Sequence, residues 1–394
     1  MPSKKQLDIF AITNEIQSYS VRSNSIYSGD VINYGLDNLY PNQVFDIVQD
    51  SPTAGGCVKR KSEFVFGQGT ESDIIVNRHN KTLNDIINVV CQEYSKYNGF
   101  ALHFNYNLIG QIVEIQNVDL RYVRKLKDML NVIVGKIRRD SKVINLSSAN
   151  KVKIPLYQPN GIKKYVQQSG GFKKFNGAVF YFNNNTGIYP VSTYDSALTS
   201  AQFEQEAQIF SYMNVKNGFS SSGVLKIPNM PDDPKAKKEY EEKIKKVVGS
   251  QNAGSMLVIE APLDLEGGMQ ASKIFEPFQT QNVDKVHQVQ SDRAKDFILR
   301  AFNMPEILLG VSSDGMFNQE SFQDAFNYYN NDTDRDRIKI EKSFNQFWQE
   351  TSFSSELAEI EIIPLDEMGE KKVNNMVEAE FEDSEDDDGS NNTD

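Results

Sequence analysis

The chain has 394 residues, of which 39% are hydrophobic and 24% are charged, and this length predicts two or three domains. No apolar run reaches about eighteen residues and no signal-peptide pattern is present, so we expect a protein that neither spans a membrane nor is secreted. The formal net charge of −12 is unevenly placed, because residues 366–394 hold 12 acidic and 2 basic side chains and the remainder holds 42 and 40. The body is therefore nearly neutral, and the acidity lies in the tail.

The N-terminal part of the chain predicts an irregular arm followed by helices. Residues 1–35 follow no sustained period, and we expect them to be partly ordered. Gly67-Gln68-Gly69 is interpreted as a helix end rather than a phosphate-binding loop, because it follows a helix and lacks the third glycine. Three helices are expected here: a short one opened by Pro41, one capped by Ser51 that ends near Phe66, and one from Thr82 to Tyr97.

The pattern then changes to a period of two. Residues 100–116 alternate around an Ile109-Gly110 turn, which predicts a β-hairpin, and further strands with short turns are expected to about Tyr181. The segment from Arg121 to Lys174 carries 14 Lys/Arg residues against two Asp residues, a net charge of +12. In a protein that handles DNA, such a segment favours a binding surface. The alternatives are a solvated sheet face, or a face that meets another protein.

Beyond this segment the chain predicts a long helix and a small α/β unit. The helix is expected from Ser196 to Asn217, and its apolar positions suit packing between neighbours. SSGVLKIP (residues 221–228) predicts a strand, and KAKKEYEEKIKKVV (235–248) predicts a charged helix with Glu–Lys pairs worth about 0.2–0.5 kcal/mol each. Strands are expected again at residues 256–260 and 273–278.

An amphipathic helix is expected over residues 281–303, and it ends before Pro305, which disfavours helical geometry in the preceding residue. Residues 304–320 form a short apolar segment and a polar loop. This stretch contains Glu306, Asp314 and Glu320 and no basic residue.

The C-terminal part predicts a second long helix, from Ser321 to Phe347, and a strand from Leu357 to Ile363. The tail from about Asp366 has too few apolar residues to offset the entropy of ordering it, so we expect it to be disordered.

The order of these motifs resembles one family, the portal proteins of tailed bacteriophages with long non-contractile tails. The resemblance covers about residues 195–350, and an N-terminal pattern of Tyr-Pro, Ser-Pro-Thr and Gly-x-Gly also resembles that group. It rests on six motifs: a helix ending in Asn217-Gly218, SSGVLKIP, a charged helix, GSQNAGSMLVIE, a stem helix with Asp284 at its start, and AFNMPEILLG before a polar Asn-Gln-Glu loop.

The resemblance implies an α+β portal fold with an α/β wing, long stem helices, a small α/β clip and a disordered acidic tail. The family's helical crown domain is minimal or missing in this sequence. The implied units are an N-terminal arm (1–35), the wing (36–195), stem helix 1 (196–217), the clip (218–280), stem helix 2 (281–303), the tunnel loop (304–320), a long helix that returns to the wing with a terminal strand (321–365), and the tail (366–394).

The resemblance also implies functional residues. The tunnel loop would face the DNA channel with Ser312, Ser313, Asp314, Gly315, Met316, Phe317 and Asn318. The clip would present Lys237, Lys238, Glu241 and Lys245 to the packaging motor and the tail adaptor. The mixed charges of stem helix 2 suit ion pairs between subunits, and they are Asp284, Lys285, Asp292, Arg293, Asp296 and Arg300.

A portal is a homo-oligomeric ring, commonly of about twelve subunits, at one capsid vertex. The implied partners are double-stranded DNA in the channel, the terminase large subunit, the head–tail adaptor, and the major capsid and scaffolding proteins, with no membrane. The implied location is the virion, after assembly in the host bacterial cytoplasm. The implied functions are genome packaging and ejection.

No enzyme signature is present in the sequence. GxxxxGK[ST], GxSxG and HExxH are absent, Cys57 and Cys91 form no CxxC pair, and the three histidines lie far apart. We therefore expect no catalytic residue, metal or cofactor, and no ATPase or nuclease activity. The alternative functions are another head–tail connector protein, or a nucleic-acid-processing enzyme that uses the basic 121–174 segment.

Overall fold

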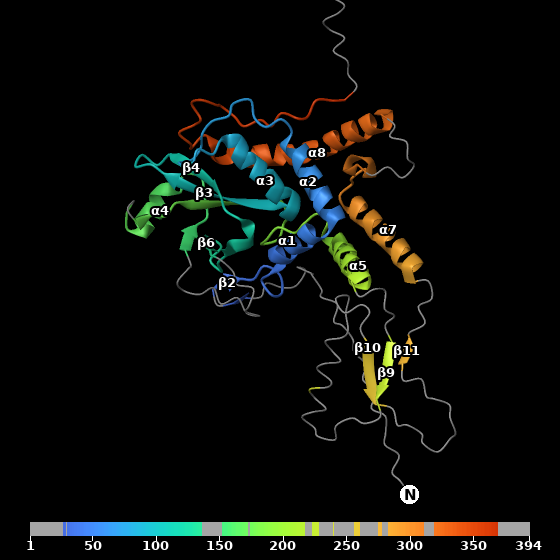
Figure 1. The fold of residues 1–394 in the computed structure, drawn as a ribbon. Helices are drawn as coiled ribbons and strands as arrows, with labels where there is room; N and C mark the ends of the chain where they lie inside the picture. The colour runs from blue at the N-terminus through green and yellow to red at the C-terminus, as the bar shows by residue number, and fades with distance from the viewer. Residues whose placement is uncertain are drawn as a thin grey trace, which may run out of the picture.

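The structure is a computed structural model that describes residues 27–28, 30–135, 152–171, 174–216, 223–227, 239, 256–260, 275–277, 283–310 and 319–368. Helices and small sheets are mixed along the chain, which confirms the predicted α+β class. Figure 1 shows an α/β body from which two helices, α5 (Leu198–Lys216) and α7 (Val283–Ala301), project toward a small separate sheet.

Three helices open the body where the sequence predicted them: α1 (Tyr40–Asp50), α2 (Pro52–Phe66) and α3 (Leu83–Tyr97). Their ends follow ordinary capping chemistry. The Ala54 backbone N–H donates to Ser51 Oγ at 3.1 Å at the start of α2. Thr82 and Asp85 form a capping box at the start of α3, and Asn98 ends α3 in the left-handed conformation.

A three-stranded antiparallel sheet forms the centre of the body. Its order is β4 (Ile112–Asn117), β3 (Gly99–Tyr106) and β8 (Ala178–Asn183). The β3–β4 pair is the predicted hairpin. Because side chains alternate across a strand, the sheet has one apolar face toward each of two cores.

One core lies between the sheet, α3 and the C-terminal half of α8 (Gln319–Trp348). It is rich in aromatic rings. Phe104 of β3 and Phe347 of α8 have ring centroids 4.5 Å apart, and Trp348 is fully buried. This core closes one face of the sheet with the long helix that follows the projecting pair.

The other core joins the opposite face of the sheet to α1, α2 and the body ends of α5 and α7. It also packs against a second antiparallel sheet, whose order is β5 (Val123–Lys125), β6 (Asn131–Val134) and β7 (Val152–Pro155). Short 3₁₀ turns at Leu120–Tyr122, Asp195–Ala197 and Glu306–Leu309 connect these elements.

Residues 30–35, assigned to the N-terminal arm from the sequence, belong to the body. A two-residue hairpin pairs β1 (Tyr27–Ser28) with β2 (Val31–Ile32), and Ile32 and Tyr34 are buried in the second core. Tyr34 stacks on Tyr189 with ring centroids 4.3 Å apart.

Two predicted secondary structures were wrong. Strands were expected up to Tyr181, but α4 (Ile162–Ser169) lies between β7 and β8. A strand was expected from Leu357 to Ile363, but this segment is an extended strap with a single bridge, between Ile363 and Gly69. The strap bonds to side chains of α8: the backbone N–H groups of Ile360 and Ile362 donate to Asn345 and Glu341, both at 2.8 Å.

The strap continues along α8 to Met368. A Cβ at Gly67 would collide with the carbonyl of Ile363, so glycine is needed where the strap crosses the end of α2. Asn327 exchanges two hydrogen bonds of 3.0 Å with the backbone of Met368. Residues 366–368, assigned to the tail from the sequence, thus lie against α8.

Candidate functional site

The two projecting helices are rooted in the body core. Leu198 and Ala201 at the start of α5 are buried, as are Ile298 in the last turn of α7 and Phe302 directly after it. The side chain of Phe302 stacks on Tyr194, with ring centroids 4.3 Å apart. The two helices pack against each other, so they leave the body as a pair (Figure 1).

Polar contacts fix the direction of α5 relative to α1 and α2. The carboxylate of Glu204 accepts hydrogen bonds from the hydroxyls of Ser51 and Thr53 at the N-terminus of α2, where the helix dipole favours a negative charge. Gln205 donates to the carboxylate of Asp50 at 2.7 Å. The pair is therefore held at a defined angle to the body.

Apolar side chains are exposed along the projecting pair. Phe297 and Val289 on α7 are 54% and 50% exposed, and Tyr212 on α5 is 64% exposed. The buried side of α7, by contrast, is formed by Ala294, Ile298 and Leu299. A helix whose outer face also carries large apolar residues has surface available for a further protein contact.

Four of the six predicted inter-subunit residues lie on this outer face. Asp292, Arg293, Asp296 and Arg300 are all exposed, and none of them forms an ion pair with any residue described for this chain. Asp284 and Lys285 lie in the first turn of α7, and their side chains are outside the described residues. The one ion pair of α7 in the described chain is Lys295 with Glu306.

The N-terminal end of the predicted tunnel loop is anchored in the body, and its C-terminal end is the start of α8. Leu308 is buried, Gly310 takes the left-handed conformation at φ +77°, and α8 begins at Gln319. The carboxylate of Glu306 forms an ion pair with Lys295, so it is not a free charge at the surface. The predicted channel residues Ser312, Ser313, Asp314, Gly315, Met316, Phe317 and Asn318 lie outside the described residues.

A small sheet lies beyond the free ends of α5 and α7 (Figure 1). Its order is β10 (Met256–Glu260), β9 (Gly223–Ile227) and β11 (Phe275–Pro277), with β9 and β10 parallel and β11 antiparallel. All three predicted strands of this region are confirmed. The clip residues Lys237, Lys238, Glu241 and Lys245 lie outside the described residues.

Among the described residues of the basic 121–174 segment, four bases have structural partners, whereas Lys163, Lys164 and Lys174 are exposed. Arg124 is fully buried and donates to backbone carbonyls, among them Asn38 O at 2.8 Å. Arg121 pairs with Asp119 at 2.5 Å, and Lys153 pairs with Asp128 at 3.7 Å. Lys125 lies over the Tyr181 ring at 4.4 Å, where burial lowers the pKa of its ammonium to about 8. Several of these bases thus have structural partners.

The described part of the chain has no cluster that suits a metal ion, and its two cysteines are buried. No group of three or more His, Cys, Asp or Glu side chains there is placed to hold a metal ion. Cys57 and Cys91 are buried, and burial raises the pKa of the Cys57 thiol to about 12, so it is not poised as a nucleophile. Among the same residues, no helix has the length and apolar content to cross a bilayer.

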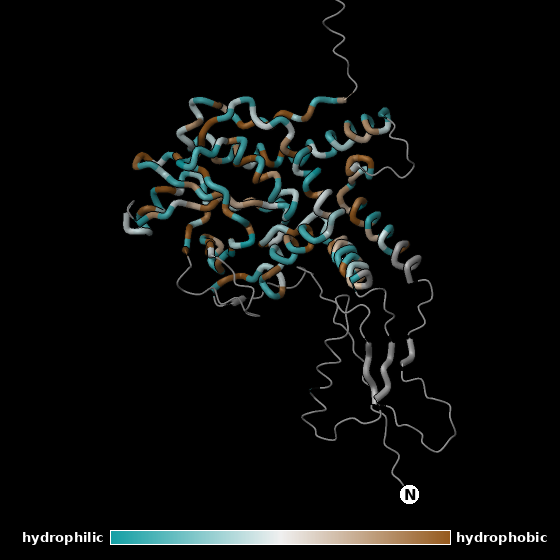
Figure 2. Tube along the Cα trace, viewed as in Figure 1, coloured by the Kyte–Doolittle hydropathy of each residue, from teal (hydrophilic) through white to brown (hydrophobic). Residues whose placement is uncertain are grey.

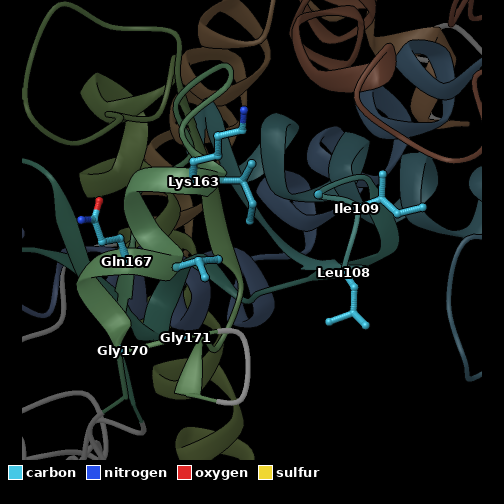
Figure 3. A pocket seen from close by; sticks show the side chains of 9 residues that line it. Leu108, Ile109, Lys163, Gln167, Gly170 and Gly171 are labelled. Carbon is cyan, nitrogen blue, oxygen red and sulfur yellow. The ribbon is translucent and has the colours of Figure 1, made fainter.

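The sequence reasoning missed one exposed feature, the tip of the β3–β4 hairpin. Leu108 and Ile109 are 81% and 87% exposed there, and they border a groove lined by α4 (Figure 3). Figure 2 shows this tip as a hydrophobic segment at the edge of the body. The signal available in the sequence was a turn occupied by two aliphatic residues, where polar residues are usual.

No protein-family model and no curated protein sequence matches the chain. Solved structures are similar in fold. A chain of the virion of a native gene transfer agent particle is 14% identical with a TM-score of 0.48, and the match covers 86% of each chain. A chain of the neck of the native particle, computed with C12 symmetry, is 13% identical with a TM-score of 0.48, and covers 82% of this chain and 84% of that one. An HK97-family phage portal protein from Corynebacterium diphtheriae is 10% identical with a TM-score of 0.41, and covers 80% and 94%.

Proposed function

We propose that this chain is a phage portal protein, the subunit of a ring at one capsid vertex through which DNA enters during packaging and leaves during ejection. The observation that carries this proposal is the outer face of the projecting helices. It combines exposed Phe297 and Val289 with four exposed charges of both signs, Asp292, Arg293, Asp296 and Arg300.

A surface of this composition suits a contact between copies of one chain. In a ring, one face of each subunit meets a different face of the next, so acidic and basic side chains of one helix can find partners on a neighbour. Exposed ion pairs are worth only about 0–1 kcal/mol each, so the apolar side chains would supply most of the affinity. The number of subunits, about twelve in the proposal, follows from the family resemblance.

The remaining units take their roles from the order of the chain. In the proposal, α5 and α7 form the stem, and the β9–β11 sheet belongs to the clip, where the terminase large subunit and then the head–tail adaptor dock. The loop between Gly310 and Gln319 has no basic residue. This composition supports a place along the channel, because a ring of inward-facing lysines would bind phosphates many times over and hold the DNA.

The alternatives are less well supported. A nucleic-acid-processing enzyme would bind through the basic segment, but of the described bases Arg124 is buried and Arg121 and Lys153 are paired, which leaves Lys163, Lys164 and Lys174 as exposed charges without an ion pair to a described residue. Another head–tail connector would also form a ring, but that ring would not lie between the terminase and the capsid while DNA is packaged.

Negative-stain electron microscopy of the purified full-length chain tests the proposal. We expect rings with a central hole, and light scattering should give the mass of a closed oligomer. A chain that stays monomeric at micromolar concentration and at low and moderate salt would contradict the portal assignment. Rings that form but do not support packaging of DNA into procapsids with a terminase would favour the other connector.

A further inference from the structure

A groove separates the tip of the β3–β4 hairpin from α4, at the outer edge of the body (Figure 3). Its volume is about 520 Å³. The apolar side chains that line it come from both elements: Leu108 and Ile109 from the hairpin, and Ile162 and Val166 from α4. A cavity of this size accommodates apolar side chains of another molecule, and none of the described segments of this chain fills it.

The hairpin tip is a preorganised structure. The side-chain oxygen of Asn107 accepts hydrogen bonds from the backbone N–H groups of Ile109, Gly110 and Gln111 at 3.1, 2.9 and 2.9 Å. Gly110, at φ +97°, completes the turn. Because the backbone is fixed by its own polar contacts, the exposed aliphatic side chains are not needed to form the turn. A partner that binds them would lose little conformational entropy in this loop.

The opposite wall is equally well fixed. Tyr165 is the buried residue of α4, and its hydroxyl donates to the carbonyl of Leu156 at 2.7 Å. Its ring stacks near Phe175, with centroids 6.4 Å apart. This anchoring turns Ile162 and Val166 toward the groove.

Three lysines lie at or beside the groove, and we call them the lysine rim. Lys163 lines the groove, Lys164 is the next residue of α4, and Lys174 lies close to the lining residue Gly170. All three lysines are exposed, and no ion pair with a described residue involves any of them. None of the residues that line the groove is acidic.

We propose that this groove is a docking site for an acidic amphipathic segment of another protein, whose apolar side chains enter between the hairpin tip and α4 while its carboxylates meet the lysine rim. The charge of the rim selects an acidic partner, and the concave apolar wall selects side chains rather than a flat surface. The inference does not depend on the portal assignment, because it rests only on residues of the hairpin and α4.

The experiment uses the full-length chain with a fluorescent reporter at the groove. Cys57 and Cys91 are buried, so Gln167→Cys on the exposed side of α4 provides a single accessible thiol for an environment-sensitive dye. The probe is a synthetic peptide with Leu and Phe at helical spacing and Glu at the intervening positions. Two matched peptides carry Lys in place of Glu, or Ser in place of the apolar residues.

We expect saturable binding of the acidic amphipathic peptide alone. Leu108→Ser with Ile109→Ser should weaken it at least about tenfold, because two aliphatic contacts are lost. Lys163→Glu with Lys164→Glu should weaken it most at low salt, where charges are least screened. Ile75→Ser and Lys342→Glu are the matched controls, since both residues are exposed and far along the chain from the groove, and they should leave the affinity unchanged.

Three outcomes would contradict the docking proposal. Absence of saturable binding by the acidic peptide, or equal binding by the hairpin-tip variant and the Ile75→Ser control, would overturn the proposal. Binding of phosphatidylglycerol vesicles or of double-stranded DNA in place of the peptide, lost in the same variants, would reassign the groove to a lipid surface or to nucleic acid. Ring formation is measured separately, so a failure here is distinguishable from a failure of the portal assignment.

Discussion

Two buried arginine side chains connect elements of the body by donating hydrogen bonds to backbone carbonyls. Arg337 of α8 is buried and donates to Phe64 O at 2.7 Å and to Asn330 O at 2.8 Å, so it satisfies a carbonyl in the last turn of α2. Arg124 does the same for loop carbonyls near Asn38. Breaking such a buried network costs more than losing an exposed pair, because the remaining polar atoms lose their partners.

Buried charges of this kind could not be predicted from the sequence. Arg124 lies in the basic 121–174 segment, where composition favoured a binding surface or a solvated face. A cation is buried only where the fold brings several carbonyls around it, and those carbonyls are distant in sequence or belong to irregular turns. The number of basic residues therefore overstates the charge available at the surface.

At Glu93 the structure predicts a pH dependence of stability. Burial raises the pKa of this carboxyl well above its usual value, the Asp119 carboxylate raises it further, and Lys96 opposes both. Its Oε1 accepts from the Leu120 backbone N–H at 3.4 Å, and Oε2 has no hydrogen-bond partner in the described chain. A carboxyl with a raised pKa in the folded state stabilises it below the unfolded pKa and loses this contribution as pH rises.

Glu93→Gln should therefore match the wild type at about pH 4 and exceed it in stability at about pH 7. Glutamine has the shape of the protonated acid and does not ionise. Urea denaturation of both proteins across this pH range checks the prediction. Parallel stability curves would show that Glu93 does not titrate on unfolding.

At the scale of the element, helices with strong local signals were predictable, and short or tertiary-dependent segments were not. The helices α1, α2, α3, α5, α7 and α8 have caps, breakers or a long period. In contrast, α4 is an eight-residue helix with one buried side chain, Tyr165, too short for its period to stand out. The strap at residues 357–363 alternates like a strand, but its partners are α8 side chains rather than a free sheet edge.

The helix α7 allows a test of the proposed ring interface. Phe297 is 54% exposed in the subunit, so Phe297→Asp should leave the folded subunit intact. Ring assembly should fail or weaken strongly, because each contact loses the burial of an aromatic side chain, about 1.5–3 kcal/mol, and gains a charge to desolvate. Ile75, also 54% exposed but on the body, gives the matched control Ile75→Asp.

Size-exclusion chromatography with light scattering measures the outcome, and thermal melting reports on the fold. Assembly of Phe297→Asp at wild-type concentration would show that this face of α7 is not a subunit contact. Loss of assembly in both variants would point to a general effect of added charge.

At the scale of the molecule, the order of the helices and strands was accessible from the sequence and their contacts were not. The helix α5, the strands β9, β10 and β11 and the helix α7 follow one another as predicted, and their assignment to stem and clip stays a proposal. The mixed charges of residues 284–300 were also predictable, and four of them are exposed. The groove beside α4 was not, because it joins residues about fifty positions apart through an unpredicted helix.

The C-terminal strap predicts where the chain becomes dispensable. Ile360 and Ile362 are buried, and Met368 is hydrogen-bonded to Asn327. A chain ending after Met368 should therefore form rings and melt as the full-length protein does, although it lacks most of the acidic tail. A chain ending before Leu357 should be destabilised by about 4 kcal/mol or more, because two buried isoleucines are lost, at about 2–5 kcal/mol each. Differential scanning calorimetry compares the two, and a lower melting temperature on removal of residues 369–394 alone would show that the tail packs on the body.

The proposed channel can be tested at residues 304–320, which contain no basic residue. Asp314→Lys would place a ring of ammonium groups along the path of the DNA. Each phosphate that is neutralised adds a salt-dependent contribution to binding, with a log–log slope of about −0.9, so many such contacts would hold the DNA and slow packaging. Ring assembly should be unchanged, and the defect should ease as salt screens the contacts.

Asp324→Lys, the same charge change at an exposed position of α8, is the control. Packaging is followed as nuclease-protected DNA per procapsid at several salt concentrations. Normal packaging by Asp314→Lys at low salt would show that this loop does not face the channel, and a matching defect in Asp324→Lys would show that added positive charge, rather than its position, is responsible.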